Sequence, residues 1–413
     1  MNIRKEVIFK MMDKELISRL ADEHGTPFYL VDCESLVSQY EELKECLPSN
    51  STIAYATKAN YTPSVIRTFR DLGTRFDVFS QGELNLLMRN GCDLERVIYT
   101  SVAEQEEEFL FGLKNGVRRF VLGSINGINN FGRAAEREGA EGVEVLLRIQ
   151  PVTNVDAAVS TSGIESKFGV VFSDEKDSVG NTLEAIAERG LDFAGFHFHL
   201  GSQIRSPDPY VKAINETLDF ALAQDIEVRV LDVGGGFPVD YGFEVPPIEK
   251  FGAEIGKVIE KWRKKLGDFE LTVEPGRFLT ADSTVLVVRV VNEKEMYGRK
   301  VLIVDGSEDM VSVDRHEMRI EIEEITHSNE PVAASIAGNL CHSLDWIVKE
   351  PIELSGVEPG DLLVFEKEGA YVMNHNMPYN LRRVPKVLTV GEGEVKEEEH
   401  PFSTIGKIRV AYE

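Results

Sequence analysis

Eight short apolar segments recur through the first two thirds of the chain, and helix-like segments separate most of them. The strand-like segments are Thr52–Thr57, Arg75–Phe79, Val97–Thr100, Arg119–Leu122, Val143–Ile149, Phe193–Phe198, Val228–Val233 and Glu270–Val273. The helix-like segments include Gly82–Arg89, Glu104–Asn115, Gly127–Glu138, Asp177–Arg189, Tyr210–Gln224 and Phe251–Leu266. Strands that alternate with helices indicate βαβ units and a parallel sheet. Eight repeats over roughly 220 residues favour a TIM-like (β/α)8 barrel over an open sheet.

The alternation stops near Thr284, and the segments that follow are strand-like without helices between them. They are Val285–Val291, Lys300–Val304, Arg319–Ile325, Val332–Ile336, Leu362–Phe365, Lys386–Val390 and Lys407–Tyr412. This pattern predicts a second, all-β domain. The acidic stretch Gly391–His400 is predicted to be a solvated loop or hairpin tip.

The N-terminal segment has apolar residues at helical spacing and predicts an amphipathic helix that ends at Gly25, followed by a strand, Pro27–Asp32. We therefore expect three parts. Residues 1–29 form an N-terminal segment that packs with the β domain, 30–283 form the barrel, and 284–413 form the C-terminal β domain.

Composition excludes several classes of protein. The net charge of −25 argues against a nucleic-acid or anionic-membrane surface. No apolar run approaches the length of a membrane span, and the charged N-terminus does not read as a secretory signal. The 4 cysteines include no CxxC pair and make no disulfide framework, so we expect a cytoplasmic protein.

A barrel of this kind carries its active site after the C-terminal ends of its strands. Polar residues follow six of the predicted strands, and the strand starts are predicted to lack such a cluster. The segments are Lys58, Asp77–Ser80, Arg148–Pro151, His197–Gln203, Asp232–Phe237 and Glu274–Arg277. The sequence therefore predicts one site built from several strand ends.

Each polar group has two interpretations when it is taken alone. Lys58 could reach solvent at a strand end, or its amine could attack a carbonyl. Gly234–Gly236 could be turn material, or with Arg277 it could bind a phosphate. His197 and His199 could be a metal pair, but no third ligand of suitable spacing accompanies them, so no metal is expected. His197 could be a packed core residue, and His199 is predicted to cover a flat ligand.

Glu274 could belong to an ordinary ion pair, or it could hold a proton on a pyridine nitrogen. A carbonyl-reactive lysine, a phosphate site, a stacking histidine and a carboxylate for a pyridine nitrogen together describe pyridoxal 5'-phosphate. This combination makes the cofactor the first functional prediction.

With these residues in place, the chain resembles the pyridoxal-phosphate decarboxylases of the alanine-racemase-like fold, which act on diaminopimelate, ornithine and arginine. The resemblance runs from about Thr26 to the C-terminus and is strongest to the diaminopimelate branch. Its motifs are Tyr55–Asn60, Phe76–Ser80, Glu165–Gly169, His197–Gln203, Gly234–Gly236, Glu274–Arg277, Cys341–Asp345 and Gly369–Tyr371.

The resemblance implies a role for each matching residue. Lys58 would bond to the cofactor aldehyde, His199 would stack on its ring, and Glu274 would pair with the ring nitrogen. The remaining cofactor-binding residues would be Asp77, Arg148, Ser202, Gly235, Gly236, Gly276, Arg277 and Tyr371. Racemases of this fold have an arginine where this chain has Glu274, so the glutamate favours decarboxylation.

The resemblance also implies a homodimer whose active site is shared across the interface. Cys341, from the β domain, would donate a proton to the carbon that loses CO2, with Lys58 as the other candidate donor. A lone cysteine is otherwise commonly an inert buried thiol. The substrate would be a small amino acid, contacted by Arg277, His342, Asp345 and Tyr371.

Two positions depart from the diaminopimelate branch. Its Arg-Pro-x-x-Tyr segment is absent from Asp305–His316, and the acidic residue that usually follows the cysteine is His342. A histidine does not replace an anion that faces an ammonium group. We therefore expect altered recognition of the distal end of the substrate. The alternatives are a decarboxylase of ornithine, lysine, arginine or a modified diamino acid, and a non-catalytic homologue that binds the cofactor.

Overall fold

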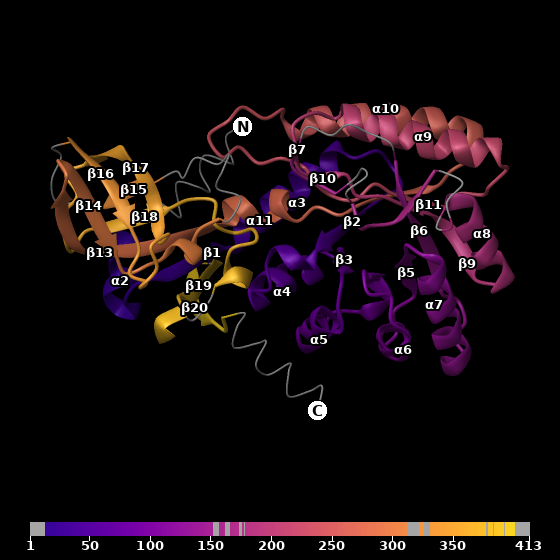
Figure 1. Ribbon diagram of the computed structural model, residues 1–413, viewed down its shortest axis with the longest axis horizontal. Helices are drawn as coiled ribbons and strands as arrows, with labels where there is room; N and C mark the ends of the chain where they lie inside the picture. The colour runs from indigo at the N-terminus through magenta and orange to yellow at the C-terminus, as the bar shows by residue number, and fades with distance from the viewer. Residues whose placement is uncertain are drawn as a thin grey trace.

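The computed structural model contains a parallel barrel with a β domain beside it (Figure 1). It describes residues 13–151, 157–161, 166–172, 176, 178–312, 322–325, 331–376, 379–382, 384–391 and 393–400. The predicted strand 407–412 and the first three residues of the predicted strand 319–325 lie outside the described residues.

Eight parallel strands close into a ring, as predicted. They are β2 (Ser51–Ala56), β3 (Arg75–Val78), β4 (Val97–Thr100), β5 (Arg119–Leu122), β6 (Glu144–Gln150), β9 (Asp192–His197), β11 (Val230–Asp232) and β12 (Glu270–Val273). Neighbours pair in this order, and β12 pairs with β2 to complete the circle. β8 (Val170–Val171) adds to β6, and β7 (Ala157–Ser160) forms a separate ribbon with β10 (Gly201–Ile204). The (β/α)8 barrel is confirmed.

Helices cover the outside of the barrel. They are α3 (Cys33–Cys46), α4 (Pro63–Asp71), α5 (Gln81–Arg89), α6 (Glu106–Lys114), α7 (Ile125–Glu138), α8 (Val179–Glu188), α9 (Asp208–Ala223), α10 (Ile248–Leu266) and the short α11 (Arg277–Thr280). The longest, α10, buries Phe251, Ile255, Ile259 and Trp262 along one face, the spacing of an amphipathic helix. No helix in the described part of the chain is long and apolar enough to cross a membrane.

Side chains that point into the barrel form three layers, because alternate residues of a strand share one face. The middle layer is apolar and forms a cluster of its own: Ala54, Ile98, Val121, Leu146, Ala194 and Val230. Two residues further along the strands, Arg148 and Asp232 stand at the C-terminal end of the barrel. Two residues earlier, Arg119 and Glu144 stand at the opposite end.

The predicted lack of polar chemistry at the strand starts is wrong. The buried Arg119, which begins β5, lies 3.0 Å from Glu144 at the start of β6 and 2.9 Å from Glu270 at the start of β12. The charged residues were visible in the sequence, but only ring closure brings β5 and β12 together across the barrel. This cluster closes the end of the barrel that carries no predicted site.

The β domain is built around a strand from the N-terminal segment. Its strands are β1 (Phe28–Asp32), β13 (Thr284–Met296), β14 (Arg299–Val304), β15 (Ile322–Ile325), β16 (Pro331–Ala337), β17 (Trp346–Ser355), β18 (Leu362–Phe365), β19 (Lys386–Gly391) and β20 (Glu394–Glu398). β1 lies between β13, its antiparallel partner, and β19, its parallel partner. This sheet continues to Asp32, past the predicted boundary at residue 29. β17 was not predicted, and the stretch predicted as an acidic loop contains β20.

The first described helix, α2 (Lys14–His24), packs on this sheet (Figure 1). Asp13 caps its start by accepting the N–H of Glu15 at 3.0 Å, and Gly25 ends it with φ 73°. Its apolar face, which includes Ile17 and Leu20, joins a cluster with strands β1, β13 and β18. The N-terminal segment is therefore part of the β domain core.

Candidate active site

Lys58 lies directly after β2, in the short helix η1 (Thr57–Ala59), at the C-terminal end of the barrel. Its Nζ is 2.7 Å from Oδ2 of Asp77 and 4.2 Å from the centre of the Phe79 ring. Its side chain is 33% exposed. Burial opposes its charge, but Asp77 and then Tyr371 and Glu274 raise its pKa above the ordinary value. The resting amine is therefore an ammonium that is held by one carboxylate.

Asp77 ends its own barrel strand, β3, with its side chain wholly buried. Burial, followed by the nearby Glu274 carboxylate, raises the pKa of Asp77 to about 7, although Lys58 opposes this shift. Its Oδ1 has no hydrogen-bond partner among the described residues. Asp77 is thus a carboxylate whose charge depends on the lysine beside it.

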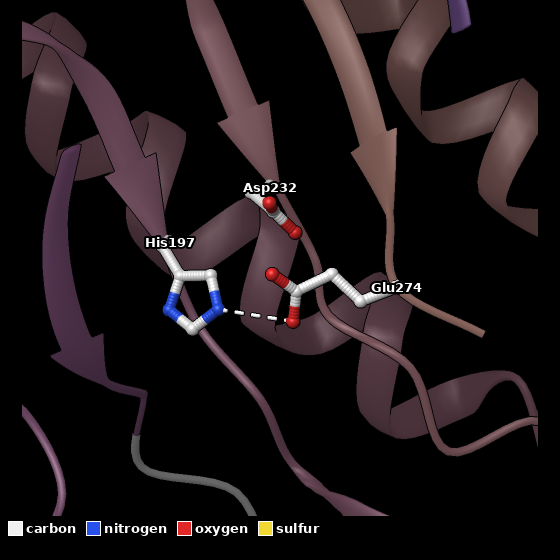
Figure 2. A group of neighbouring side chains, drawn as sticks. All are labelled: His197, Asp232 and Glu274. Atoms are coloured by element: carbon white, nitrogen blue, oxygen red, sulfur yellow. Dashed lines mark hydrogen bonds and ion pairs between the residues drawn. The ribbon is translucent and has the colours of Figure 1, made fainter. Parts of the chain in front are cut away.

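Three further groups meet at the ends of β9, β11 and β12. Figure 2 shows His197, Asp232 and Glu274 pointing toward one another. Nε2 of His197 lies 3.3 Å from Oε2 of Glu274, and all three side chains are buried. Burial opposes the charge of Glu274, but its interaction with His197 and then the charge of Lys58 outweigh this and lower its pKa to about 2. Glu274 is therefore an anion in the centre of the barrel end.

The same three residues could hold a metal ion by geometry, since one ligand atom from each lies within 4.8 Å of the others. His199 is not part of this group. The paired-histidine metal site weighed from the sequence is therefore not formed by the two histidines together. The expected absence of a metal stays a prediction.

His199 is fixed instead by the glycine loop. Its Nδ1 accepts the N–H of Gly235 at 3.1 Å. Burial, then the charges of Lys58 and Arg148, lower the pKa of His199 to about 3, so the ring is neutral at neutral pH. A neutral, oriented imidazole suits stacking on an aromatic ligand. The N–H of Gly235, predicted to bind phosphate, is therefore already used in this structure.

The loop Gly234–Gly236 requires glycine because other backbone segments approach it closely. A Cβ at Gly235 would lie 2.1 Å from the carbonyl oxygen of Glu274, and one at Gly236 would lie 2.4 Å from that of Gly201. The N–H of Gly234 donates to Oδ1 of Asp232 at 2.9 Å. The loop is thus packed directly onto the site residues.

Arg277 and Tyr371 meet at the boundary between the two domains. The guanidinium carbon of Arg277 lies 4.9 Å from the centre of the Tyr371 ring, and its Nη1 donates to Tyr241 Oη at 3.3 Å. The N–H of Tyr371 donates to the carbonyl oxygen of Ala59 at 2.8 Å. A Cβ at Gly276 would lie 3.0 Å from Tyr371 Oη. The β domain thus contributes Tyr371 to the barrel end that carries Lys58.

Two other predicted residues lie on the barrel side of the site. Arg148 is buried at the end of β6, 4.4 Å from the centre of the Phe168 ring. Burial lowers its pKa, although Glu274, Asp77 and Asp232 oppose this. Ser202 is a partly exposed residue of β10, next to Gly201.

The predicted residues of the loop after β16 lie apart from this group. Cys341 is exposed, and its N–H donates to Oδ1 of Asn380 at 2.8 Å. Nδ1 of His342 is 3.7 Å from Oε1 of Glu308. No hydrogen bond or ion pair in the described parts of the chain joins Cys341 or His342 to the barrel residues.

Asp345 is buried, and both of its carboxylate oxygens accept backbone N–H groups. Oδ1 accepts from Glu308 and Oδ2 from Leu340, at 2.8 and 2.7 Å. These bonds tie the loop after β16 to the loop after β14. The geometry supports a role in shaping the loop rather than the predicted contact with substrate.

From the sequence, Asp232 is placed in a polar segment after its strand but has no assigned role, and His197 is open between a core residue and a ligand. Strand alternation could have found Asp232, which lies two residues after the inward-facing Val230. It could not have found His197, because an irregularity in β9 near Ala194 shifts the alternation. Their partner in each case, Glu274, is far away in the sequence. The parallel pairing of β11 with both β9 and β12 brings them together.

Residues 33–281 match the family described as pyridoxal-dependent decarboxylase, pyridoxal binding domain. That stretch covers more than half of the chain. The chain belongs to the pyridoxal-dependent decarboxylases. It is thus a carboxy-lyase that uses pyridoxal phosphate, and the predictions of family, enzyme class and cofactor are confirmed.

Relatives of this decarboxylase match along nearly the whole chain. The diaminopimelate decarboxylase of Neisseria meningitidis is 31% identical over 90% of this chain and 92% of its own length. That of Methanothermobacter thermautotrophicus is 28% identical over 94% and 92%.

Solved structures agree with these relatives. Diaminopimelate decarboxylase from M. jannaschii in complex with L-lysine superposes with a TM-score of 0.84 at 26% identity, covering 94% of this chain and 93% of the other. Lysine/ornithine decarboxylase from Vibrio vulnificus, complexed with putrescine, gives a TM-score of 0.80 at 27% identity, covering 92% and 98%. The β domain is therefore shared as well as the barrel.

The residues at the barrel end fit pyridoxal phosphate. The cofactor requires an amine for its aldehyde, an anion near its ring nitrogen and donors for its phosphate. Lys58 supplies the amine and Glu274 the anion. Oδ1 of Asp77 is buried without a hydrogen-bond donor among the described residues, as expected where a ligand supplies one.

Proposed function

We propose that this decarboxylase removes CO2 from a small amino acid whose distal end is recognised differently from that of diaminopimelate. Pyridoxal phosphate supplies the electron sink for the pair of electrons that CO2 leaves behind. Lys58 would hold the aldehyde carbon, His199 would cover the ring, and Glu274 would face the ring nitrogen. Arg277 and Tyr371, together with Ser202 and the glycines, would bind the phosphate.

The observation that supports altered recognition of the substrate's distal end is the pair formed by His342 and Glu308. His342 occupies the position after Cys341, where the diaminopimelate branch usually has an acidic residue. Its Nδ1 lies 3.7 Å from Oε1 of Glu308, and its ring meets that of Tyr379 edge-on, with centres 5.9 Å apart. An imidazole is a poorer partner than a carboxylate for a distal ammonium group. A less cationic distal end is therefore favoured.

We further propose that Cys341 acts in the active site of a second copy of the chain. It is exposed in the single chain, and two strongly exposed apolar residues lie near it in sequence or across the loop: Leu344 at 68% and Leu381 at 92%. Exposed apolar side chains of this size are typical of a surface that a partner covers. The partner's Cys341 would then deliver a proton to the carbon that loses CO2. The cytoplasmic location stays a prediction, which the four free thiols support.

The experiment is a steady-state panel that measures CO2 release as kcat/KM. The substrates are meso-diaminopimelate, lysine, ornithine, arginine and the N-acylated or carboxylated derivatives of each. We expect a derivative with a less cationic distal end to exceed meso-diaminopimelate by at least roughly tenfold, the effect of one lost charged hydrogen bond. Efficient turnover of plain meso-diaminopimelate would contradict the proposal of altered recognition.

A second candidate is a decarboxylase of lysine or ornithine. The likeness to the Vibrio vulnificus lysine/ornithine decarboxylase over both domains favours it. The same panel separates the two, because this candidate requires lysine or ornithine to be the best substrate. A chain that bound the cofactor and released no CO2 from any member of the panel would leave the non-catalytic alternative.

A further inference from the structure

Asp232 and Glu274 present two buried carboxyl groups to each other. The two residues end neighbouring strands, β11 and β12, and Figure 2 shows their oxygens facing. One carboxylate oxygen of Asp232 lies within 4.8 Å of one carboxylate oxygen of Glu274. The side chains are 0% and 4% exposed, so water does not screen them. Two buried anions at this distance would repel each other strongly.

The hydrogen bonds around the pair leave one oxygen of each carboxyl group without a donor, and a single shared proton would satisfy both. Oδ1 of Asp232 accepts the N–H of Gly234 at 2.9 Å, and Oε2 of Glu274 lies 3.3 Å from Nε2 of His197. The other oxygen of each, Oδ2 of Asp232 and Oε1 of Glu274, has no donor in the described parts of the chain when both groups are ionised. A single proton on Asp232 would give both oxygens a partner.

The surrounding charges decide which carboxyl group holds that proton. Lys58 and Arg148 are the cations at this barrel end, and Asp77 faces it from β3. His197 and His199 lie beside them as neutral rings. Burial, then Glu274, then Asp77 raise the pKa of Asp232 well above its usual range. In contrast, the hydrogen bond from His197 and the charge of Lys58 keep the pKa of Glu274 low, although burial opposes this. The proton therefore belongs to Asp232.

His197 completes the arrangement as a neutral ring. Burial lowers its pKa, although Glu274 opposes this shift. A neutral imidazole with its proton on Nε2 donates to Glu274 and leaves Nδ1 as an acceptor. Nδ1 is indeed buried with no donor among the described residues. Glu274 is then held from two sides by neutral donors and keeps its charge.

We infer that Asp232 is a positioning residue that carries a proton at neutral pH and donates it to Glu274. Held between Asp232 and His197, the Glu274 carboxylate is fixed as an anion before any ligand binds. It is then ready to stabilise a protonated ring nitrogen of the cofactor. This inference rests on the proposed placement of Glu274 beside that nitrogen, but the proton on Asp232 does not depend on the substrate.

The first test reads the proton directly. Infrared spectra of the purified full-length protein at neutral pH should contain the C=O stretch of a neutral carboxyl group, and Asp232→Asn should remove part of it. Asp361→Asn is the matched control, because Asp361 is a buried aspartate of the β domain that accepts the N–H of Glu358. We expect this control to leave the band unchanged. An identical band in wild type and Asp232→Asn would overturn the inference.

The second test compares two substitutions by the affinity for pyridoxal phosphate, measured by fluorescence titration. Asparagine can accept from Gly234 and donate to Glu274, so Asp232→Asn should retain most of the affinity. Asp232→Leu should weaken it by roughly tenfold to a hundredfold, as expected for a hydrogen bond to a charged group. Equal losses in both variants would show that the proton on Asp232 is not what holds Glu274.

The two tests separate this inference from the proposed function and from a metal site. If Asp232→Asn loses part of the infrared band while wild type turns over no amino acid, the proton on Asp232 is supported and the proposed function is contradicted. One divalent ion per chain that disappears in Asp232→Asn would overturn the inference, because an ion would then occupy the place of the proton. If Asp232→Leu fails to fold, the infrared comparison of Asp232→Asn with Asp361→Asn decides whether Asp232 carries the proton.

Discussion

Nζ of Lys58 lies 2.7 Å from Oδ2 of Asp77, and this carboxylate is the nearest anion to the lysine in the described structure. Asp77→Asn should lower the pKa of Lys58, because burial favours the neutral amine and only Tyr371 and Glu274 would still oppose it. The measurement is the pH dependence of the rate at which pyridoxal phosphate, trapped with borohydride, modifies Lys58 in the cofactor-free chain.

The midpoint of that profile should move to lower pH in Asp77→Asn. The pKa of Asp77 is about 7, so wild type should approach the variant as the pH falls below about 7 and Asp77 takes up a proton. Asp192→Asn, at the opposite end of the barrel beside Arg229, serves as the control. An unchanged midpoint would contradict the electrostatic role of Asp77.

Lys58→Ala should remove the absorption band near the visible–ultraviolet edge that a lysine-bound cofactor gives. The reason is that no other amine stands at this barrel end at a comparable distance from Asp77 among the described residues. Lys257→Ala is the matched control, since Lys257 is an exposed helix residue paired with Glu254. The spectrum of the purified proteins is the readout, and a band that survives in Lys58→Ala would refute the assignment.

His342→Glu should shift specificity toward plain meso-diaminopimelate, because a carboxylate would again face the distal ammonium group. We expect kcat/KM for that substrate to rise by roughly tenfold, the scale of one charged hydrogen bond. His342→Gln, which adds no charge, should not produce this rise. The ratio of kcat/KM between meso-diaminopimelate and the best wild-type substrate reports the change.

Mixing Lys58→Ala and Cys341→Ala subunits should restore activity if the site is shared between two copies. A mixed dimer would contain one complete site, so random exchange at equal amounts should recover about a quarter of wild-type activity. CO2 release before and after mixing gives the result, with each variant alone as control. No recovery after demonstrated subunit exchange would mean that each chain completes its own site.

Arg119→Met should destabilise the barrel, because it leaves Glu144 and Glu270 together without their shared cation. We expect a loss of about 2–3 kcal/mol, less than for a fully buried pair since both carboxylates are partly exposed. Denaturant unfolding of the full chain measures it, with Arg133→Met, at an exposed ion pair, as control.

This effect should depend on pH. Burial opposes the charge of Glu270, but hydrogen bonds and charge from Arg119 lower its pKa. Its contribution is therefore present above the unfolded pKa of about 4 and lost as the pH falls. The difference between wild type and Arg119→Met should shrink below about pH 4, and a constant difference would contradict this origin.

Much of the architecture could be predicted from local sequence. The barrel strands end within two residues of their predicted bounds, since apolar runs between helical segments leave few alternatives. β17 was missed because charged residues interrupt its apolar positions, and among the described strands it pairs with β16 alone. β1 was predicted as a strand, but the sheet that it joins depends on pairing with β13 and β19, which lie more than 250 residues away in sequence.

By itself, the sequence predicts which residues gather at the barrel end, because strand ends and motif residues are local features. The tertiary structure alone decided how they are paired. Glu274 meets His197 and Asp232 because β9, β11 and β12 pair as neighbours, and Arg119 meets Glu270 because the closed ring brings β5 and β12 around one interior. Charge in a buried site depends on such neighbours, so the protonation of Asp232 and Asp77 could not be derived from sequence position.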